Sequence, residues 1–195
     1  CVKEALEKSG KIDLLVNNAG GQFPSNAEKI SKKGWHAVLE TNLTGSFLVA
    51  REVFLSSMRE HGGAIVNVTM NMRNGFPMMA HSAAARAGVE NLTRSLSTEW
   101  GRYGVRVNSI APGIIRSSGL DSYDPAFKEF VLSAAKNNQS YRLGTEAETA
   151  SAIIFLLSPG AAFITGETLR VDGGEALYSP LMPPVKNDRF PVWDD

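Results

Sequence analysis

The sequence has 195 residues, 43% of them hydrophobic and 21% charged, a composition typical of a globular domain and not of a disordered chain. Lys plus Arg and Asp plus Glu each number 20, so the net charge of zero provides no field that attracts nucleic acid. The single cysteine excludes an internal disulfide, and the three histidines are too widely spaced for a zinc site, so we expect no metal. No apolar run approaches the ~20 residues of a membrane span.

The first residues already follow a helical pattern. Val2, Ala5 and Leu6 have helical apolar spacing, with no capping residue before them, and Gly10 ends this helix. The apolar run at residues 14–16 then predicts a buried strand. This start inside a helix predicts a fragment that is truncated on its N-terminal side.

Helices and strands alternate along the rest of the chain. A small-residue turn at 17–21 precedes two predicted helices, one capped by Ser31 and running to residue 39 and one at about 44–60. The later predicted elements are strands at 64–68, 105–110 and 169–171, helices at 82–103 and 145–157, and a polar segment at 117–143 that is helical near 127–135. The alternation predicts an α/β fold with a parallel sheet and right-handed crossovers. We assign residues 1–178 to this domain and the Pro-rich residues 179–195 to a C-terminal surface extension.

Two small-residue turns follow predicted strands at the same edge of this sheet. The first contains Gly20 and Gly21, and the second is Pro112-Gly113. Each could be a tight turn that needs no ligand. Because open parallel sheets bind ligands at the carboxyl ends of their strands, the shared edge favours a ligand site.

Four motifs resemble, in order and spacing, those of the short-chain dehydrogenase/reductases. They are Asn17-Asn18-Ala19-Gly20, Asn42 within TNLTG, Ala111-Pro112-Gly113, and Ile164-Thr165-Gly166 with Val171-Asp172-Gly173-Gly174. This resemblance spans residues 10–174 and implies a Rossmann-like doubly wound parallel sheet that binds a nicotinamide cofactor. Within the family, segments such as HSAAARAGV and LLSPGAAFITGETLRVDGG look most like the trans-2-enoyl-CoA reductases of peroxisomes, whose nearest relatives in activity are 2,4-dienoyl-CoA reductases.

The glycine-rich turn that holds the cofactor phosphates in this family has no counterpart in the sequence. The family pattern places that turn upstream, together with the residues that select NADP over NAD. NADPH is therefore expected from the resemblance alone. The implied cofactor-binding residues are Asn18, Ala19, Gly20, Arg86, Pro112, Gly113 and Ile115.

The catalytic positions depart from the commonest family members. Anchoring the comparison on Gly88-Val89 puts Met70, Ser82 and Arg86 where those members have Ser, Tyr and Lys. A serine does not readily replace tyrosine as an acid, and Arg86 holds its proton too tightly to relay it, although it can bind ribose hydroxyls. Ordinary alcohol dehydrogenation is therefore disfavoured.

In the reduction of an enoyl thioester, charge develops on the thioester oxygen as an enolate that hydrogen-bond donors can stabilise, and the α-carbon can then take a proton from water. The mitochondrial dienoyl-CoA reductases have a tyrosine fifteen positions before the helix lysine, and this resemblance points to Asn71, whose amide could donate to the thioester oxygen or could merely close a turn. Ser82 could cap the helix that starts there, and the neighbouring His81 is a conceivable acid that is more often structural at a helix start. Asn42 stands where the family holds a relay water, or it bonds a helix backbone. The expected catalytic set is Asn42, Asn71, Ser82 and Arg86.

The resemblance implies NADPH-dependent reduction of trans-2-enoyl-CoA to saturated acyl-CoA in fatty-acid chain elongation. The substrate would be a fatty acyl-CoA, covered by residues 117–143 as a lid. The alternatives are a carbonyl or dienoyl-CoA reductase, a relative that binds acyl-CoA or cofactor without turnover, and a structural subunit assembled through the helices at 44–60 and 82–103. A homo-oligomer and a peroxisomal location are also implied, although the sequence ends without an SKL-like tripeptide. The fragment alone is expected to be inactive.

Overall fold

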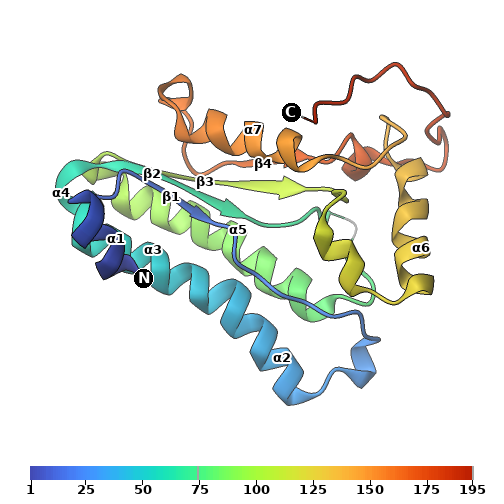
Figure 1. Ribbon diagram of the computed structural model, residues 1–195, viewed down its shortest axis with the longest axis horizontal. Helices are drawn as coiled ribbons and strands as arrows, with labels where there is room; N and C mark the ends of the chain where they lie inside the picture. The colour runs from blue at the N-terminus through green and yellow to red at the C-terminus, as the bar shows by residue number, and fades with distance from the viewer. Residues whose placement is uncertain (74, 195) are drawn as a thin grey trace.

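A computed structural model describes residues 1–73 and 75–194 and has a four-stranded parallel sheet at its centre. In sheet order the strands are β1 (Leu14–Asn17), β2 (Gly63–Val68), β3 (Val105–Pro112) and β4 (Thr168–Val171). Val66 of β2 pairs with Val16 on one side and with Asn108 on the other. The carboxyl ends of the strands therefore share one edge, and the arrows in Figure 1 point from left to right towards α6 (Pro125–Ser133).

Helices cover both faces of this sheet. Figure 1 shows α3 (Gly45–Val53) and α5 (Ala80–Trp100) on one face and α7 (Glu146–Leu157) on the other. Neighbouring residues of a strand point to opposite faces, so Ile65 packs with Trp100 of α5 while Val66 packs with Leu156 of α7. The prediction of a doubly wound α/β fold is confirmed.

The helix at residues 32–61 is continuous, and the prediction of two separate helices is wrong. Ser31 accepts a hydrogen bond from Gly34 N at 3.0 Å and caps the start, as expected. The helix then runs through α2 (Lys32–Leu39), η2 (Glu40–Thr44), α3, η3 (Phe54–Met58) and α4 (Arg59–His61). The segments η2 and η3 are wide π-helical turns, and the Gly45 N–H closes η2 by donating to Glu40 O. Residues 40–44, which the prediction placed between two helices, thus form a wide turn inside one helix.

The start of α5 also differs from its prediction. The helix begins at Ala80, and its N-cap residue Met79 makes no side-chain cap bond. Ser82 lies within the first turn, so the prediction that it caps the helix is wrong.

The predicted helices at the two ends of the domain are confirmed. They are α1 (Val2–Ser9), which ends at Gly10 with a φ of 75°, and α7. The short helices are η1 (Ala27–Lys29), η4 (Gly101–Tyr103), η5 (Ser118–Ser122), η6 (Ala134–Asn137), η7 (Pro159–Ala161) and η8 (Glu175–Leu177).

Residues beyond η8 return to the segment that precedes α7. Asn187 Nδ2 donates to Gln139 O at 3.2 Å, and Arg142 Nη2 donates to Pro191 O at 2.6 Å. The C-terminal extension therefore contacts the end of the expected lid, while the domain boundary at 178 stays a prediction.

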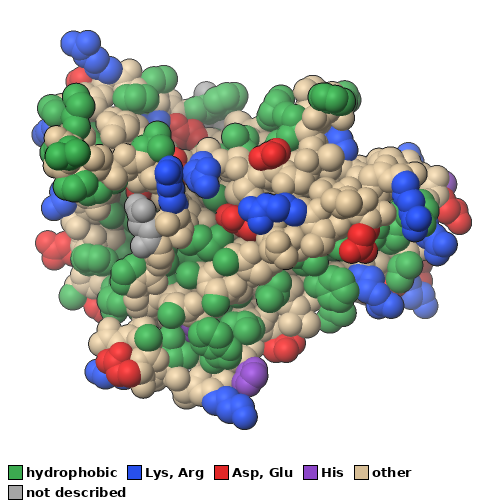
Figure 2. Space-filling view, turned by 180° about the vertical axis from the view of Figure 1, so that it is seen from behind, with side chains coloured by type: hydrophobic (Ala, Val, Ile, Leu, Met, Phe, Trp, Pro, Cys, Tyr) green, Lys and Arg blue, Asp and Glu red, His purple; other side chains and the backbone are tan. Residues whose placement is uncertain are grey.

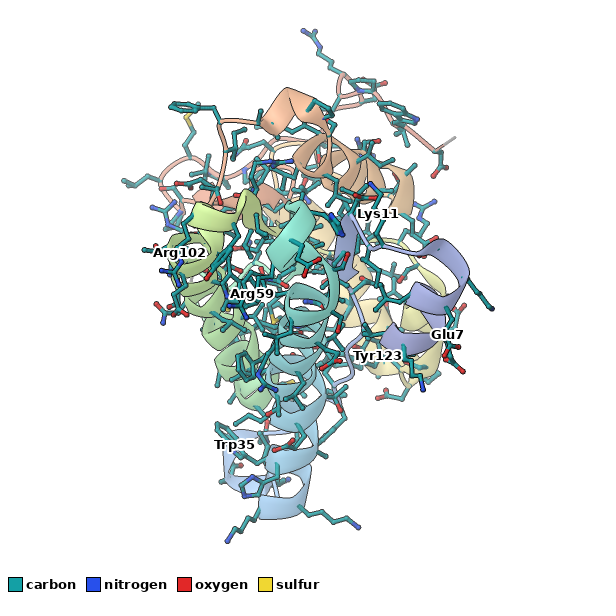
Figure 3. All side chains as sticks on the ribbon, turned by 90° about the vertical axis from the view of Figure 1, so that its left-hand side faces the viewer. Glu7, Lys11, Trp35, Arg59, Arg102 and Tyr123 are labelled. Atoms are coloured by element: carbon teal, nitrogen blue, oxygen red, sulfur yellow. The ribbon has the colours of Figure 1, made fainter. Side chains whose placement is uncertain are left out.

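Two arginines flank the ring of Tyr103, which ends η4 shortly before the amino end of β3. The guanidinium carbons of Arg102 and Arg59 lie 4.9 Å and 5.9 Å from the centroid of the Tyr103 ring. Figure 3 labels the two arginines, which lie at the end of the molecule that faces the viewer. In the described part of the chain we find neither a helix long and apolar enough to cross a membrane nor a cluster of three or more His, Cys, Asp or Glu placed to hold a metal ion. Charges of both signs are interspersed over the face in Figure 2.

Candidate functional site

A cavity of about 350 Å³ lies at the carboxyl edge of the sheet. Its floor comes from the segments that follow β1, β2 and β3, and η5 and α6 of the expected lid cover it. Seven of the predicted site residues line it, namely Gly20, Asn42, Asn71, Arg86, Pro112, Gly113 and Ile115. The cavity lies where parallel sheets of this kind bind ligands.

Three predicted site residues are not part of the cavity lining. Asn18 and Ala19 lie in the exposed loop after β1, and their proposed cofactor contacts stay a prediction. Ser82 is buried behind the cavity wall. His81, the alternative acid, is fully buried outside the lining, where its ring meets Phe23 edge-to-face at 4.5 Å.

Arg86 places a buried guanidinium at the cavity. Its side chain is 9% exposed, and its Nη1 donates to Val68 O at 2.5 Å. Burial lowers the pKa of this guanidinium, and within residues 1–73 and 75–194 no carboxylate forms an ion pair with it. Because a guanidinium carries five N–H donors, Arg86 has donors to offer to a ligand with hydroxyl oxygens.

Asn42 lies in the wide turn η2, beside the loop that follows β1. Its Nδ2 donates to Gly21 O at 2.7 Å and to Val38 O at 2.8 Å, so the predicted bond to a helix backbone is present. Its buried Oδ1 has no partner among the described residues. A Cβ on Gly20 would overlap Arg86 Nη2 and lie 2.5 Å from Asn42 Oδ1, so both polar groups converge where only glycine fits.

Asn71 lies after β2, where its backbone N–H donates to Pro112 O at 2.9 Å. Its Oδ1 accepts a long hydrogen bond of 3.5 Å from Arg73 N, which is the contact of a turn, and its side chain lies close enough to Glu175 to lower the pKa of that carboxyl group. Burial raises the pKa of Glu175, the nearby Asn71 side chain opposes this shift, and nearby Asp172 adds to it. Asn71 and Glu175 both line the cavity, and the role of Asn71 as a donor to a thioester stays a prediction.

The Ser82 hydroxyl forms a hydrogen bond with the loop after β1 and does not cap the start of α5. Its Oγ donates to Gln22 Oε1 at 2.7 Å and lies 3.9 Å from the Met70 sulfur. Gln22 Nε2 in turn donates to the Tyr123 hydroxyl at 3.2 Å, and both Gln22 and Tyr123 line the cavity. The serine at the usual tyrosine position is thus connected to the cavity through another residue.

Sequence reasoning missed several residues of the cavity wall, among them Gln22, Tyr123 and Glu175. Gln22 follows the Gly20-Gly21 turn, and Glu175 follows the Gly173-Gly174 turn, so adjacency to a turn at the ligand edge was an available signal. Tyr123 lies within the expected lid, and nothing in the sequence distinguishes it there.

Comparisons with known proteins identify the family. A family model described as Enoyl-(Acyl carrier protein) reductase matches residues 1–175. The chain belongs to the short-chain dehydrogenase/reductases. This family uses nicotinamide cofactors, which fits a cavity where, among the described residues, the Arg86 guanidinium has no carboxylate partner and Asn42 Oδ1 has no hydrogen-bond partner.

Several relatives of this short-chain dehydrogenase/reductase act on acyl-CoA thioesters according to their names. A peroxisomal 2,4-dienoyl-CoA reductase of Rattus norvegicus is 39% identical over 183 residues, which are 92% of this chain and 62% of the rat protein. A probable 2,4-dienoyl-CoA reductase of Bacillus subtilis is 39% identical over 181 residues, or 90% and 70% of the two chains. The chain thus spans less than two thirds of the rat relative.

A solved structure has the same fold. The citronellol catabolism dehydrogenase of Pseudomonas aeruginosa is 49% identical, with a TM-score of 0.78 over 90% of this chain and 66% of that one. The predicted family and Rossmann-like fold are confirmed.

Proposed function

We propose that the protein containing this chain reduces the conjugated double bond of trans-2-enoyl-CoA thioesters with NADPH. The observation that carries this proposal is the composition of the cavity wall. It offers guanidinium, amide and hydroxyl donors, while Ser82 and Arg86 replace the tyrosine and lysine with which carbonyl reductases protonate an alkoxide. An enolate on a thioester requires stabilisation by donors, which this wall supplies.

The residues of the cavity divide between cofactor and substrate. Arg86 and Asn42 would bind ribose hydroxyls, and Pro112, Gly113 and Ile115 would flank the nicotinamide, which supplies a hydride when bound. Asn71 would donate to the thioester oxygen, since it lines the same cavity. Preference for NADPH over NADH is part of this proposal.

The substrate class is tested by steady-state NADPH oxidation with the complete protein. We expect kcat/KM to be higher for trans-2-enoyl-CoA than for 3-ketoacyl-CoA of the same chain length. A higher value for the ketone would identify a carbonyl reductase, and binding of acyl-CoA without turnover would identify a non-catalytic relative. Either result overturns the proposal.

A second candidate is reduction of 2,4-dienoyl-CoA, which the 39% identity to the rat and Bacillus subtilis reductases favours. The same assay with the dienoyl thioester separates the two candidates. Reduction of 2,4-dienoyl-CoA shortens the extended conjugated system, so the absorbance of that system decreases only in this reaction. A dominant dienoyl activity would replace the first candidate.

The cofactor contact is tested at Arg86. Arg86→Met removes the charged donors, so we expect the free energy of NADPH binding to weaken by about 1 to 3 kcal/mol, whereas Arg86→Lys keeps a donor and most of the affinity. Arg94→Met, at an exposed position of the same helix, is the matched control. Equal dissociation constants for wild type and Arg86→Met would remove Arg86 from the site.

The proposal includes a homo-oligomer and a location. Exposed apolar side chains on the helix at residues 45–58, among them Leu48 and Leu55, support self-association. A peroxisomal location is supported by the name of the rat relative, while the Bacillus subtilis relative is bacterial. Fractionation of cells that express the complete protein tests the location.

A further inference from the structure

A chain of hydrogen bonds links the helix position of Ser82 to the lid. Ser82 comes from the first turn of α5, Gln22 from the loop after β1, and Tyr123 from the residue that follows η5. The Ser82 Oγ to Gln22 Oε1 distance is 2.7 Å, and the Gln22 Nε2 to Tyr123 hydroxyl distance is 3.2 Å. Ser82 and Tyr123 lie 60 and 101 positions from Gln22 in the sequence, so the tertiary fold is what brings the three side chains together.

The direction of the hydrogen bonds decides what Tyr123 can do. Ser82 donates its proton to the Gln22 carbonyl oxygen, and this contact orients the Gln22 amide so that its NH₂ group faces Tyr123. The Tyr123 oxygen therefore acts as the acceptor and keeps its own proton. Within residues 1–73 and 75–194 this proton is donated to no protein acceptor, and Tyr123 is one of the residues that line the cavity.

The Tyr123 ring is fixed by the lid itself. Phe127 of α6 packs against it edge-to-face, with the ring centroids 5.0 Å apart. Arg86, Asn71 and Tyr123 all line this one cavity, from two segments of the sheet side and one of the lid side. A substrate bound between sheet and lid would therefore be within reach of the Tyr123 side chain as well as of Arg86 and Asn71.

We propose that Tyr123 is the proton donor of the reaction and that Gln22, oriented by Ser82, is its positioning residue. This inference rests on the proposed reduction of an enoyl-CoA. After hydride has added to the β-carbon, the two electrons of the double bond lie in the enolate. The Tyr123 O–H bond breaks, its proton forms the new C–H bond at the α-carbon, and the carbonyl of the thioester is restored. The phenolate then takes a proton from water, so no further co-reactant is needed.

Gln22 supports this step through its N–H group. A hydrogen bond to an oxygen strengthens when that oxygen becomes charged, so the Gln22 amide stabilises the phenolate more than the phenol. The bond from Ser82 polarises the same amide in the favourable direction. Serine at the usual tyrosine position thereby retains a part in catalysis without contact with the substrate.

The test is the rate and stereochemistry of reduction in D₂O by the complete protein. Wild type should place deuterium on one face of the α-carbon, because Tyr123 delivers it from one side. Tyr123→Phe keeps the ring and its contact with Phe127, so it should fold normally, with kcat lower by about 10²-fold and deuterium on both faces. A merely structural role for Tyr123 would leave the stereochemistry unchanged.

Gln22→Met tests the positioning role. We expect a smaller decrease in kcat than for Tyr123→Phe, with an unchanged dissociation constant for acyl-CoA in the absence of cofactor. The double variant should be no slower than Tyr123→Phe, because Gln22 acts only through Tyr123. Additive losses of rate would overturn this role.

Tyr178→Phe, an exposed tyrosine outside the cavity lining, is the matched control and should keep full rate and stereochemistry. Full rate and a single labelled face in Tyr123→Phe would refute the assignment of the donor and leave the proposed function intact. A wild-type protein that reduces neither enoyl-CoA nor dienoyl-CoA would overturn both proposals.

Discussion

Gly20 lines the cavity at a point where a side chain would collide with Arg86 and Asn42. A Cβ at this position would overlap Arg86 Nη2 and crowd Asn42 Oδ1, whereas a Cβ on the adjacent Gly21 would meet no atom within 4 Å. The two glycines therefore differ in the space around them, although they are neighbours in one turn.

This difference predicts different outcomes for two substitutions. Gly20→Ala should lower the free energy of unfolding by about 1 to 3 kcal/mol or displace Arg86 and weaken NADPH binding. Gly21→Ala should leave both quantities nearly unchanged. Urea unfolding and NADPH titration of the complete protein measure them, and equal behaviour of the two variants would contradict the geometry.

The site could be predicted from sequence only where a residue belongs to a motif at a strand end. Gly20, Pro112 and Gly113 were found in that way, because turns at the carboxyl edge of a parallel sheet are readable. Tyr123 was not found, because its contact with Gln22 depends on how the lid closes over the sheet. That arrangement has no local sequence signal.

Glu175 predicts a pH dependence of stability. Its pKa is raised in the folded protein, chiefly by burial, so the folded state holds this proton more tightly than the unfolded state. The carboxyl therefore favours folding below its unfolded pKa, and this contribution is lost as the pH rises through the folded pKa. We expect Glu175→Gln to have a higher Tm than wild type at about pH 8, with a difference that vanishes at about pH 4.

Thermal unfolding at several pH values checks this expectation. Glu60→Gln, at an exposed position of α4, is the control and should show little change in Tm across the range. A difference between Glu175→Gln and wild type that grows on acidification would refute the assigned sign.

The start of helix α7 is stabilised by reciprocal hydrogen bonds between Thr145 and Glu148. Thr145 Oγ1 accepts from Glu148 N at 3.1 Å, and the Glu148 carboxylate accepts from Thr145 N at 2.9 Å, which is a capping box. The Thr145 hydroxyl also donates to Trp193 O at 2.5 Å. One hydroxyl thus holds both the helix start and the C-terminal extension.

Thr145→Val should therefore destabilise the protein by about 1 kcal/mol and loosen the extension near Trp193, while the bonds of Arg142 and Asn187 remain. Urea unfolding measures the first effect, and limited proteolysis of the extension measures the second. Thr98→Val, at an exposed position within α5, is the control. Unchanged proteolysis of Thr145→Val would show that the extension is held by other contacts.

The elements that sequence predicted well are those whose signals are local. The glycine after α1 and the apolar periodicity of α5 both operate within a few residues. The break expected near residues 40–44 was wrong because Asn42 bonds Val38 O and the distant Gly21 O, and these contacts favour a wide helical turn. Tertiary contacts of this kind override local propensity.

The whole molecule presents apolar side chains to solvent. Leu48 and Leu55, on the outer face of the long helix, are 52% and 46% exposed. Such exposure on a single helix is typical of association surfaces. The isolated chain should therefore sediment as a species larger than 21.0 kDa.

Replacing both leucines with glutamate should shift sedimentation towards 21.0 kDa, because like charges oppose association through that face. Ser56→Glu, at an exposed position of the same helix, should not cause this shift. A wild-type chain that sediments as a monomer would contradict the prediction.

The wide turns η2 and η3 have a consequence for length. Each turn holds one residue more than an α-helical turn. The extra residue therefore does not rotate the part of the helix that follows it about the helix axis. Deleting one residue within either turn would restore ordinary helical winding and leave the buried faces on both sides in phase. Deleting one residue from α5 would instead rotate half of that helix by about 100° and expose its core. Relatives that differ by one residue in this region can thus retain the same packing.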